Sequence, residues 1–130
     1  MRQRWWIGAL VAGVVLIAGC SSEVPVAPWP LPDRSDPEVV QAEERIRFLV
    51  EATDVAGGSA ECEVRYLGSD DEAEFAQVSC LGKWGEAGPV RVEGDRVLRP
   101  DEATYEEDLR RLFPEGLRQL MREDPDGVRP

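Results

Sequence analysis

A helical pattern of hydrophobic and polar positions begins after Pro37. Mostly apolar residues recur there every three or four positions, which places them on one face of a helix. This set is Val39, Ala42, Ile46, Leu49, Val50 and Thr53. Ser35 or Asp36 can cap the free amides at the start, and Pro37 suits the first turn. The pattern predicts a helix that begins at about residue 37 and is stopped by Gly57 and Gly58.

Residues 61–67 and 75–81 instead alternate between apolar and polar side chains, which is the period of half-buried strands. The apolar positions are Cys62, Val64 and Tyr66 in the first segment and Ala76, Val78 and Cys80 in the second. In a hairpin centred on Asp71, residues whose numbers add to 142 lie opposite one another. This register makes the two apolar faces coincide, whereas a slip of one residue would separate them.

The same register predicts a disulfide between Cys62 and Cys80. Directly opposed residues in an antiparallel pair have Cα atoms about 4.5 to 5.5 Å apart, a separation that a disulfide accepts. The chain has 3 cysteines, and once Cys20 is given a separate role below, the other two thiols remain. A redox-active pair is the alternative, but these two cysteines lack the CxxC spacing of such sites.

Two further strands are predicted in residues 88–100. Gly94 and Asp95 suit a tight turn with glycine first, which places Val92 opposite Val97. Together with the hairpin, these strands make a four-stranded antiparallel sheet.

A second helix is predicted after the last strand, with Asp101 as its cap. Its inward face consists of Tyr105, Leu109 and Leu112, continued after a break by Leu117, Leu120 and Met121. Pro114 produces this break or kink, because proline disfavours helical backbone in the residue before it. The carboxylates at positions 106, 107 and 108 are expected on the solvent-facing side, and residues 123–130 are expected to be a frayed tail.

The order of helix, four strands and helix predicts one small α+β domain over residues 36–122, with the helices packed on one face of a curled sheet. This order resembles the small cystatin-like and NTF2-like folds. The stretch YEEDLRRLFPEGL, residues 105–117, also resembles the tails of uncharacterised actinobacterial exported proteins. Neither resemblance implies a particular activity.

The unbroken apolar run from Trp5 to Ala18 follows two arginines and is shorter than the roughly 20 residues that cross a bilayer. It predicts a signal peptide over residues 1–19. The run ends in IAGC, from Ile17 to Cys20, which resembles the lipobox of a bacterial lipoprotein. This resemblance implies cleavage before Cys20 and thioether attachment of a diacylglyceryl group to that cysteine. Secretion with an unmodified cysteine is the alternative.

Residues 20–35 are predicted to be a proline-rich tether between the lipid and the domain. Prolines at positions 25, 28, 30 and 32 prevent a helix or a central strand. An extended tether spans about 3.1 Å per residue, or on the order of 45 Å in total. Trp29 is expected to rest on the domain or on lipid headgroups, and a ligand role for the prolines is the alternative. The anchor places the protein on the extracytoplasmic face of the cell membrane.

The sequence carries 26 acidic and 15 basic residues, a net charge of −11. Loss of Arg2 and Arg4 with the signal peptide leaves 26 acidic against 13 basic residues, or −13. A surface this acidic repels phosphate backbones and anionic headgroups, so nucleic acid is not expected as a partner. A basic partner or a divalent cation fits the charge, as does a purely solubilising role.

The absence of histidine excludes catalytic triads, Cys–His dyads and zinc sites that need imidazole. The acidic stretch GSDDEAE, residues 68–74, offers oxygen ligands but lacks the spacing of a calcium loop, which favours a solvated turn. The sequence has no phosphate-cradling glycine loop, no nucleophile elbow and no metal-ligand spacing. We therefore expect no metal and no cofactor.

Trp84, between Gly82 and Gly85, is the candidate contact for a partner. An aromatic side chain on a glycine-lined loop can present a flat face to a sugar or a protein, and burial against the hairpin is the alternative. The whole sequence predicts an extracytoplasmic lipoprotein that binds an envelope protein or a cell-wall component and is not an enzyme. The alternatives are a hydrolase that uses carboxylates alone and a structural or transport-accessory lipoprotein.

Overall fold

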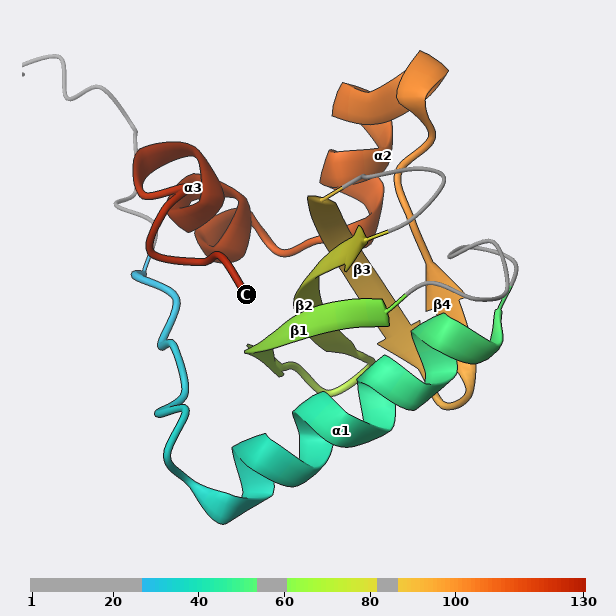
Figure 1. Cartoon of the computed structure of the whole chain (residues 1–130). Helices are drawn as coiled ribbons and strands as arrows, with labels where there is room; N and C mark the ends of the chain where they lie inside the picture. Colours follow the sequence, from blue (N-terminus) through green and yellow to red (C-terminus); the bar gives the residue numbers. More distant parts are fainter. Residues whose placement is uncertain (1–26, 54–60, 82–86) are drawn as a thin grey trace, which may run out of the picture.

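The computed structural model of this 130-residue chain describes residues 27–53, 61–81 and 87–130. The predicted anchor at Cys20 and the candidate contact Trp84 lie outside the described residues. The elements are, in chain order, α1 Pro37–Ala52, β1 Glu61–Ser69, β2 Glu74–Leu81, β3 Ala87–Glu93, β4 Arg96–Leu98, the short 3-10 helix η2 Glu102–Thr104, α2 Tyr105–Leu112 and α3 Glu115–Glu123. The strands form one antiparallel sheet in the order β1-β2-β3-β4, which confirms the predicted α+β class (Figure 1).

Helix α1 begins where the sequence predicts. Asp36 caps it, because a carboxylate oxygen accepts the amide hydrogen two residues further on at 3.0 Å. At the other end Thr53 has an extended backbone, and its amide and its hydroxyl both donate to the carbonyl oxygen of Val50. This cap ends the helix at Ala52, so the helix stops before the predicted pair of glycines.

The predicted hairpin register is confirmed from Glu61 to Tyr66. Cys62 lies opposite Cys80, and the predicted disulfide joins them with Cα atoms 4.0 Å apart. The amide of Cys62 points away from β2 and donates to Glu51 at 3.1 Å. The cysteines therefore form the type of cross-strand pair that lacks mutual hydrogen bonds, in which the two strands come closest.

The register changes after Tyr66, where β1 holds one more residue than β2. Gly68 pairs with Phe75, and Leu67 is the extra residue of a β-bulge. Gly68 has a φ of 107°, a backbone conformation that other residues rarely adopt. The bulge turns Leu67 toward the face of the sheet that carries Phe75, and both side chains are fully buried there.

Helices cover both faces of the sheet, so the predicted packing of the helices on one face is wrong (Figure 1). Successive residues of a strand point to opposite faces. Ala76 and Val78 pack with Ile46 and Val50 of α1, on what we call the α1 face. Phe75 points the other way and packs with residues of α2 and α3, on what we call the groove face. Because β2 carries apolar side chains on both faces, each face needs a cover.

The core on the groove face joins distant parts of the chain. Its buried members are Leu67, Ala73, Phe75, Leu112, Phe113, Leu117 and Val128. Pro114 separates α2 from α3, as predicted. The predicted fraying of residues 123–130 is wrong, because Val128 is 2% exposed and anchors the tail in this core.

Two predictions for α2 are also wrong. Asp108 is expected at the surface but is buried, and it accepts hydrogen bonds from the Asp101 amide, the Thr104 hydroxyl and Arg111 at 2.8, 2.8 and 3.1 Å. These three donors replace water, which makes burial of the carboxylate tolerable. Tyr105 is expected in the core but is 43% exposed, because the first turn of α2 extends beyond the core and lines the groove described below.

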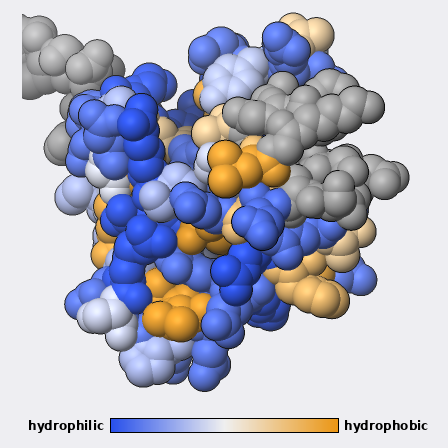
Figure 2. Space-filling model, in the orientation of Figure 1, coloured by the Kyte–Doolittle hydropathy of each residue, from blue (hydrophilic) through white to orange (hydrophobic). Residues whose placement is uncertain are grey.

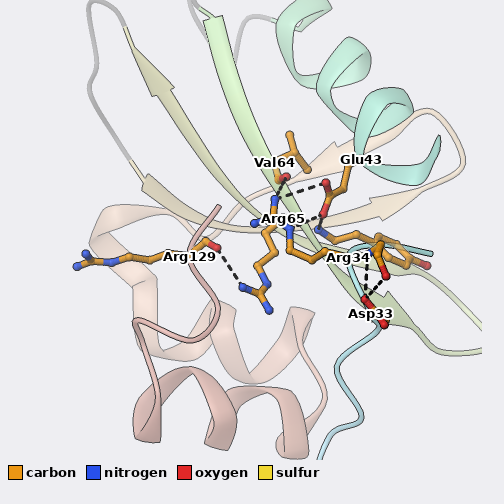
Figure 3. Close-up of polar contacts among 8 residues, drawn as sticks. Asp33, Arg34, Glu43, Val64, Arg65 and Arg129 are labelled. Carbon is orange, nitrogen blue, oxygen red and sulfur yellow. Dashed lines mark hydrogen bonds and ion pairs between the residues drawn. The ribbon is translucent and has the colours of Figure 1, made fainter. Parts of the chain in front are cut away.

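Strand β1 lies at an edge of the sheet, and side chains occupy its outward backbone groups (Figure 3). The amides of Cys62 and Tyr66 donate to Glu51 and Glu43, both at 3.1 Å. Arg34 donates to a carbonyl oxygen between them at 3.4 Å and pairs with Glu43 at 3.3 Å. Helix α1 and the segment before it thus cover an edge that would otherwise be open to another strand.

The sequence predicts that residues 20–35 form an extended tether, but residues 27–35 are docked on the domain, so the prediction is wrong for this part. The Trp29 indole donates to the carbonyl oxygen of Leu67 at 2.6 Å, and its ring meets Phe75 edge-on with centroids 5.8 Å apart. A Cβ atom at Gly116 of α3 would lie 2.9 Å from the backbone of this segment, so glycine makes room for it. The expectation that Trp29 rests on the domain is confirmed.

Candidate functional site

Of the residues that the sequence marks as sites, the two disulfide cysteines lie in the described part of the chain. Cys62 is 4% exposed and belongs to the core on the α1 face. Its burial fits a structural bridge between β1 and β2. Cys20 and Trp84 fall outside the described residues, so the structure does not place the predicted anchor or the predicted partner contact.

The acidic hairpin tip is occupied by structural contacts. One carboxylate oxygen of Asp70 accepts two amide hydrogens of the turn, at 2.8 and 2.9 Å. Glu74 pairs with Arg45 at 2.6 Å, and Glu72 pairs with Arg91 at 3.3 Å. Among the residues that the structure describes, no three His, Cys, Asp or Glu side chains gather as a metal site.

A groove of about 660 Å³ lies between the groove face of the sheet and helices α2 and α3. In Figure 1, α2 and α3 stand apart on either side of this region, above β2 and β3. They diverge because Pro114 ends α2 and starts α3 in a new direction. The volume falls within the range of small-molecule sites, about 300 to 1,000 Å³.

Each of the two helices contributes one of its faces to the groove. The lining residues are Tyr105, Glu106, Leu109 and Arg110 from α2, and Arg118, Met121 and Arg122 from α3. Within each helix these positions are separated mainly by three or four residues, so they share a side. Leu112 of α2 and Leu117 of α3 are buried in the core on the groove face and fix both helices to the sheet.

The floor of the groove comes from β2 and β3. Gln77 and Pro89 lie opposite each other in the sheet, and the Gln77 amide donates to the sulfur of Met121 at 3.5 Å. Strand β3 pairs with β2 on one side and with β4 on the other, but β4 pairs with Arg91–Glu93 only. On the β4 side, Pro89 therefore has no neighbouring strand among the described residues. A proline is tolerated there because no partner needs its missing amide hydrogen.

The groove lining is rich in positive charge. Its described members include four arginine side chains and one carboxylate side chain, namely Arg110, Arg118, Arg122, Arg129 and Glu106. The chain as a whole has the opposite balance, with 26 acidic and 15 basic residues. The fold has therefore gathered cations from two helices and the tail at one place.

These arginines differ in what they contact. Arg118 donates to the carbonyl oxygen at the end of α2 at 3.1 Å, and Arg129 pairs with Asp126 at 3.3 Å. Neither Arg110 nor Arg122 has a carboxylate oxygen within 4.0 Å in the described part of the chain. Both side chains are exposed, so their guanidinium groups are available to a ligand.

Asp108 fixes the helix wall that carries Tyr105. The amide of Asp101 is the main cause that lowers the pKa of the Asp108 carboxyl below its usual value, followed by the Thr104 hydroxyl and Arg111. The carboxylate is therefore ionised at neutral pH and joins η2 to α2.

The tail is tied to the sheet by Arg65 of β1. Its Nη1 donates to the carbonyl oxygen of Arg129 at 3.4 Å (Figure 3). Its Nε is buried and meets no hydrogen-bond partner among the described residues. Together with the burial of Val128, this contact holds Arg129 at the groove.

The face of the molecule drawn in Figure 2 carries only scattered hydrophobic side chains. Figure 2 shows a largely hydrophilic face on which the hydrophobic areas are small and separate. The exposed large apolar side chains are Val40, Phe48, Leu81 and Tyr105. Of these, Tyr105 lines the groove.

The sequence analysis missed this groove. Arg110, Arg118 and Arg122 occupy the polar sides of amphipathic helices, where charged residues are normally solvated. The available signal was the placement of Arg118 and Arg122 one turn apart with Met121 beside them, which sets two cations next to an apolar side chain. This placement indicates a binding groove only when the position of the sheet, which forms the opposite wall, is known.

Comparisons with protein-family models, with curated proteins and with solved structures find no match for this chain. Among residues 27–53, 61–81 and 87–130, none of the helices has the length and apolar character needed to cross a bilayer.

Proposed function

We propose that this chain is a lipoprotein that is anchored through Cys20 on the extracytoplasmic face of the cell membrane and binds a small component of the cell envelope. The observation that carries the binding role is the groove of about 660 Å³ between the sheet and helices α2 and α3. The IAGC motif that ends at Cys20 supports the anchor. The disulfide agrees with a protein that folds outside the reducing cytoplasm.

The lining of the groove favours binding over hydrolysis by carboxylates. A hydrolase that lacks histidine needs two nearby carboxylates with separate roles as acid and base. Glu106 is the single carboxylate side chain among the described lining residues. The remaining lining combines apolar side chains, such as Leu109 and Met121, with arginines, which is the composition of a site that holds an amphipathic molecule.

The anchor is tested by labelling growing cells with an alkyne-bearing fatty acid and measuring the label on the purified chain. The wild-type protein and Ser21→Ala, the matched control, are expected to carry the label, because neither lacks the acceptor thiol. Cys20→Ala is expected to lose it and to leave the membrane fraction. Label on Cys20→Ala, or wild-type protein found in the cytosol with residues 1–19 intact, would contradict the anchor.

The binding role is tested by adding an aromatic ring at the groove. Ala87 is exposed, lines the groove and shares its strand face with Pro89, so Ala87→Phe is expected to fill space without disturbing a core. The full lipidated chain in phosphatidylcholine nanodiscs is titrated calorimetrically with octanoate, octanamide and octylammonium, and protein-free discs are subtracted.

At least one of the three probes is expected to bind, with an affinity that Ala87→Phe lowers about tenfold or more. Ala52→Phe adds the same ring to an exposed position on α1, across the sheet, and is expected to change nothing. Absence of binding by all three probes, or equal loss in both variants, would contradict a binding site at the groove.

A further inference from the structure

We infer that the groove selects a ligand with an anionic group, a carboxylate or a phosphate, on a single apolar arm. This inference rests on the proposed binding role and adds the chemical class of the ligand. It depends on the arginines at the groove, on the apolar surface between them and on the acidic surface that surrounds both.

The arginines supply the anion site. Arg110 comes from α2 and Arg122 from α3, so two cations approach from opposite helices. Arg118 lies one turn before Arg122 on the same side of α3. A guanidinium group presents several donors in a plane and binds carboxylate and phosphate oxygens in pairs. Because Arg110 and Arg122 have no carboxylate partner among the described residues, a bound anion would supply the missing counter-charge.

The space between the helices suits an apolar arm. Leu109 and Met121 face it from the two helices, and Pro89 lies on the sheet side. Tyr105, at 43% exposure, adds an aromatic surface to the lining of the groove. A ligand that covers these side chains gains hydrophobic contact that a bare inorganic anion cannot make.

The surrounding charge limits the size of the anion. The chain has a net charge of −11, and Glu107, Glu115 and Glu123 are exposed on the same two helices that line the groove. A nucleic acid or another polyanion would extend over these carboxylates and be repelled. A molecule with one anionic head can contact the arginines without extending over these carboxylates. The charge pattern therefore favours a small amphiphile.

The test compares ligands that differ in charge and not in length. Octanoate, its neutral isostere octanamide, and octyl phosphate are titrated calorimetrically into the full lipidated chain in phosphatidylcholine nanodiscs. At least one of the two anions is expected to bind about tenfold or more tightly than octanamide. The order of octanoate and octyl phosphate distinguishes a carboxylate ligand from a phosphate ligand.

The variant Arg110→Gln with Arg122→Gln keeps most of each side-chain stem and removes both charges. It is expected to abolish the preference for the anions and to change the affinity for octanamide less than about twofold. Arg47→Gln with Arg96→Gln is the matched control, because it changes the net charge equally at exposed positions outside the groove lining. This control is expected to keep the preference.

The outcomes separate the two proposals. If octanamide, octanoate and octyl phosphate bind with equal affinity, the anion preference is overturned. The binding role nevertheless stays in place if Ala87→Phe weakens the binding of octanamide. Equal loss of preference in the two double variants would overturn it as well, because the effect would then come from overall charge. No binding by octanoate, octanamide or octyl phosphate would overturn the anion preference, and if octylammonium also failed to bind, the binding role itself would be contradicted.

Discussion

The two faces of the sheet are covered in different ways. On the α1 face, Ile46 and Val50 of one continuous helix pack along the sheet against side chains such as Val78 and Val90. On the groove face, Phe75 and Leu117 mark a core at one end, whereas the other end is the open groove. The α1 face is packed along its whole length, whereas the groove face is packed at one end only. This difference leaves room for a cavity in a small domain.

The largest expected effect comes from breaking the core on the groove face with Phe75→Ala. Phe75 is fully buried and its ring lies 5.8 Å, between centroids, from those of both Trp29 and Phe113. The substitution is expected to lower the free energy of unfolding by about 3 to 5 kcal/mol, measured by urea denaturation. Leu81→Ala, at a side chain 68% exposed, serves as control with a change within about 0.5 kcal/mol. A loss below about 1 kcal/mol for Phe75→Ala would mean that this core is dispensable.

The next effect concerns the disulfide on the α1 face. Replacing both Cys62 and Cys80 by Ala is expected to cost about 3 kcal/mol of unfolding free energy, because the bridge joins residues 18 apart and restricts the unfolded chain. Urea denaturation with and without a reductant measures it. Reductant should shift the wild-type midpoint toward that of the double variant and leave the double variant unchanged. An unshifted wild-type midpoint under full reduction would contradict the stabilising role.

A smaller effect tests how the amino-terminal segment is held to the groove-face core. Trp29→Phe keeps an aromatic ring near Phe75 but removes the indole donor to the Leu67 carbonyl oxygen. We expect a loss of about 1 kcal/mol in the free energy of unfolding, the usual value of one such bond. Pro28→Ala, at the exposed neighbour, is the control and should have less effect. An equal loss in the two variants would mean that the hydrogen bond does not hold the segment.

The smallest effect depends on pH and concerns the α2 wall of the groove. Because the pKa of Asp108 is lowered in the fold, its ionised form adds stability that is fully present above the unfolded pKa of about 3.9. This contribution is lost as the pH falls through the lowered folded pKa. Thermal unfolding should show Asp108→Asn less stable than wild type at pH 7, with the difference narrowing in acid. Glu107→Gln, exposed and adjacent, should show no such narrowing. A constant difference from pH 7 into acid would argue against the carboxylate.

The sequence predicts those parts of the fold that local pattern determines. Alternation in two segments joined by a short polar turn allows one register that aligns both apolar faces, and this fixed the pairing of Cys62 with Cys80. Pro114 acts on the backbone of its own helix, so the break follows from residue type alone. The sequence leaves Ser35 or Asp36 as the cap of the first helix, and the structure assigns it to Asp36.

The parts that the sequence did not predict depend on contacts between distant segments. The bulge at Leu67 turns that side chain toward Phe75, and the alternation of apolar and polar residues does not reveal this contact between two strands. Asp108 looks like a solvent-facing carboxylate until the Asp101 amide and the Thr104 hydroxyl turn toward it. The groove likewise needs α2, α3 and β3 to be placed first, because periodicity identifies the apolar side of a helix and not its neighbour.

The covered edge of β1 has a consequence for the proposed membrane anchor. Such an anchor would confine copies to two dimensions, where they would meet side by side more often than in free solution, and a bare strand edge would then be open to pairing with another copy. Here Glu43 and Glu51 take up outward amide hydrogens of β1, and Arg34 takes up a carbonyl oxygen. A strand from another copy therefore meets backbone groups of β1 that are already hydrogen-bonded within their own chain.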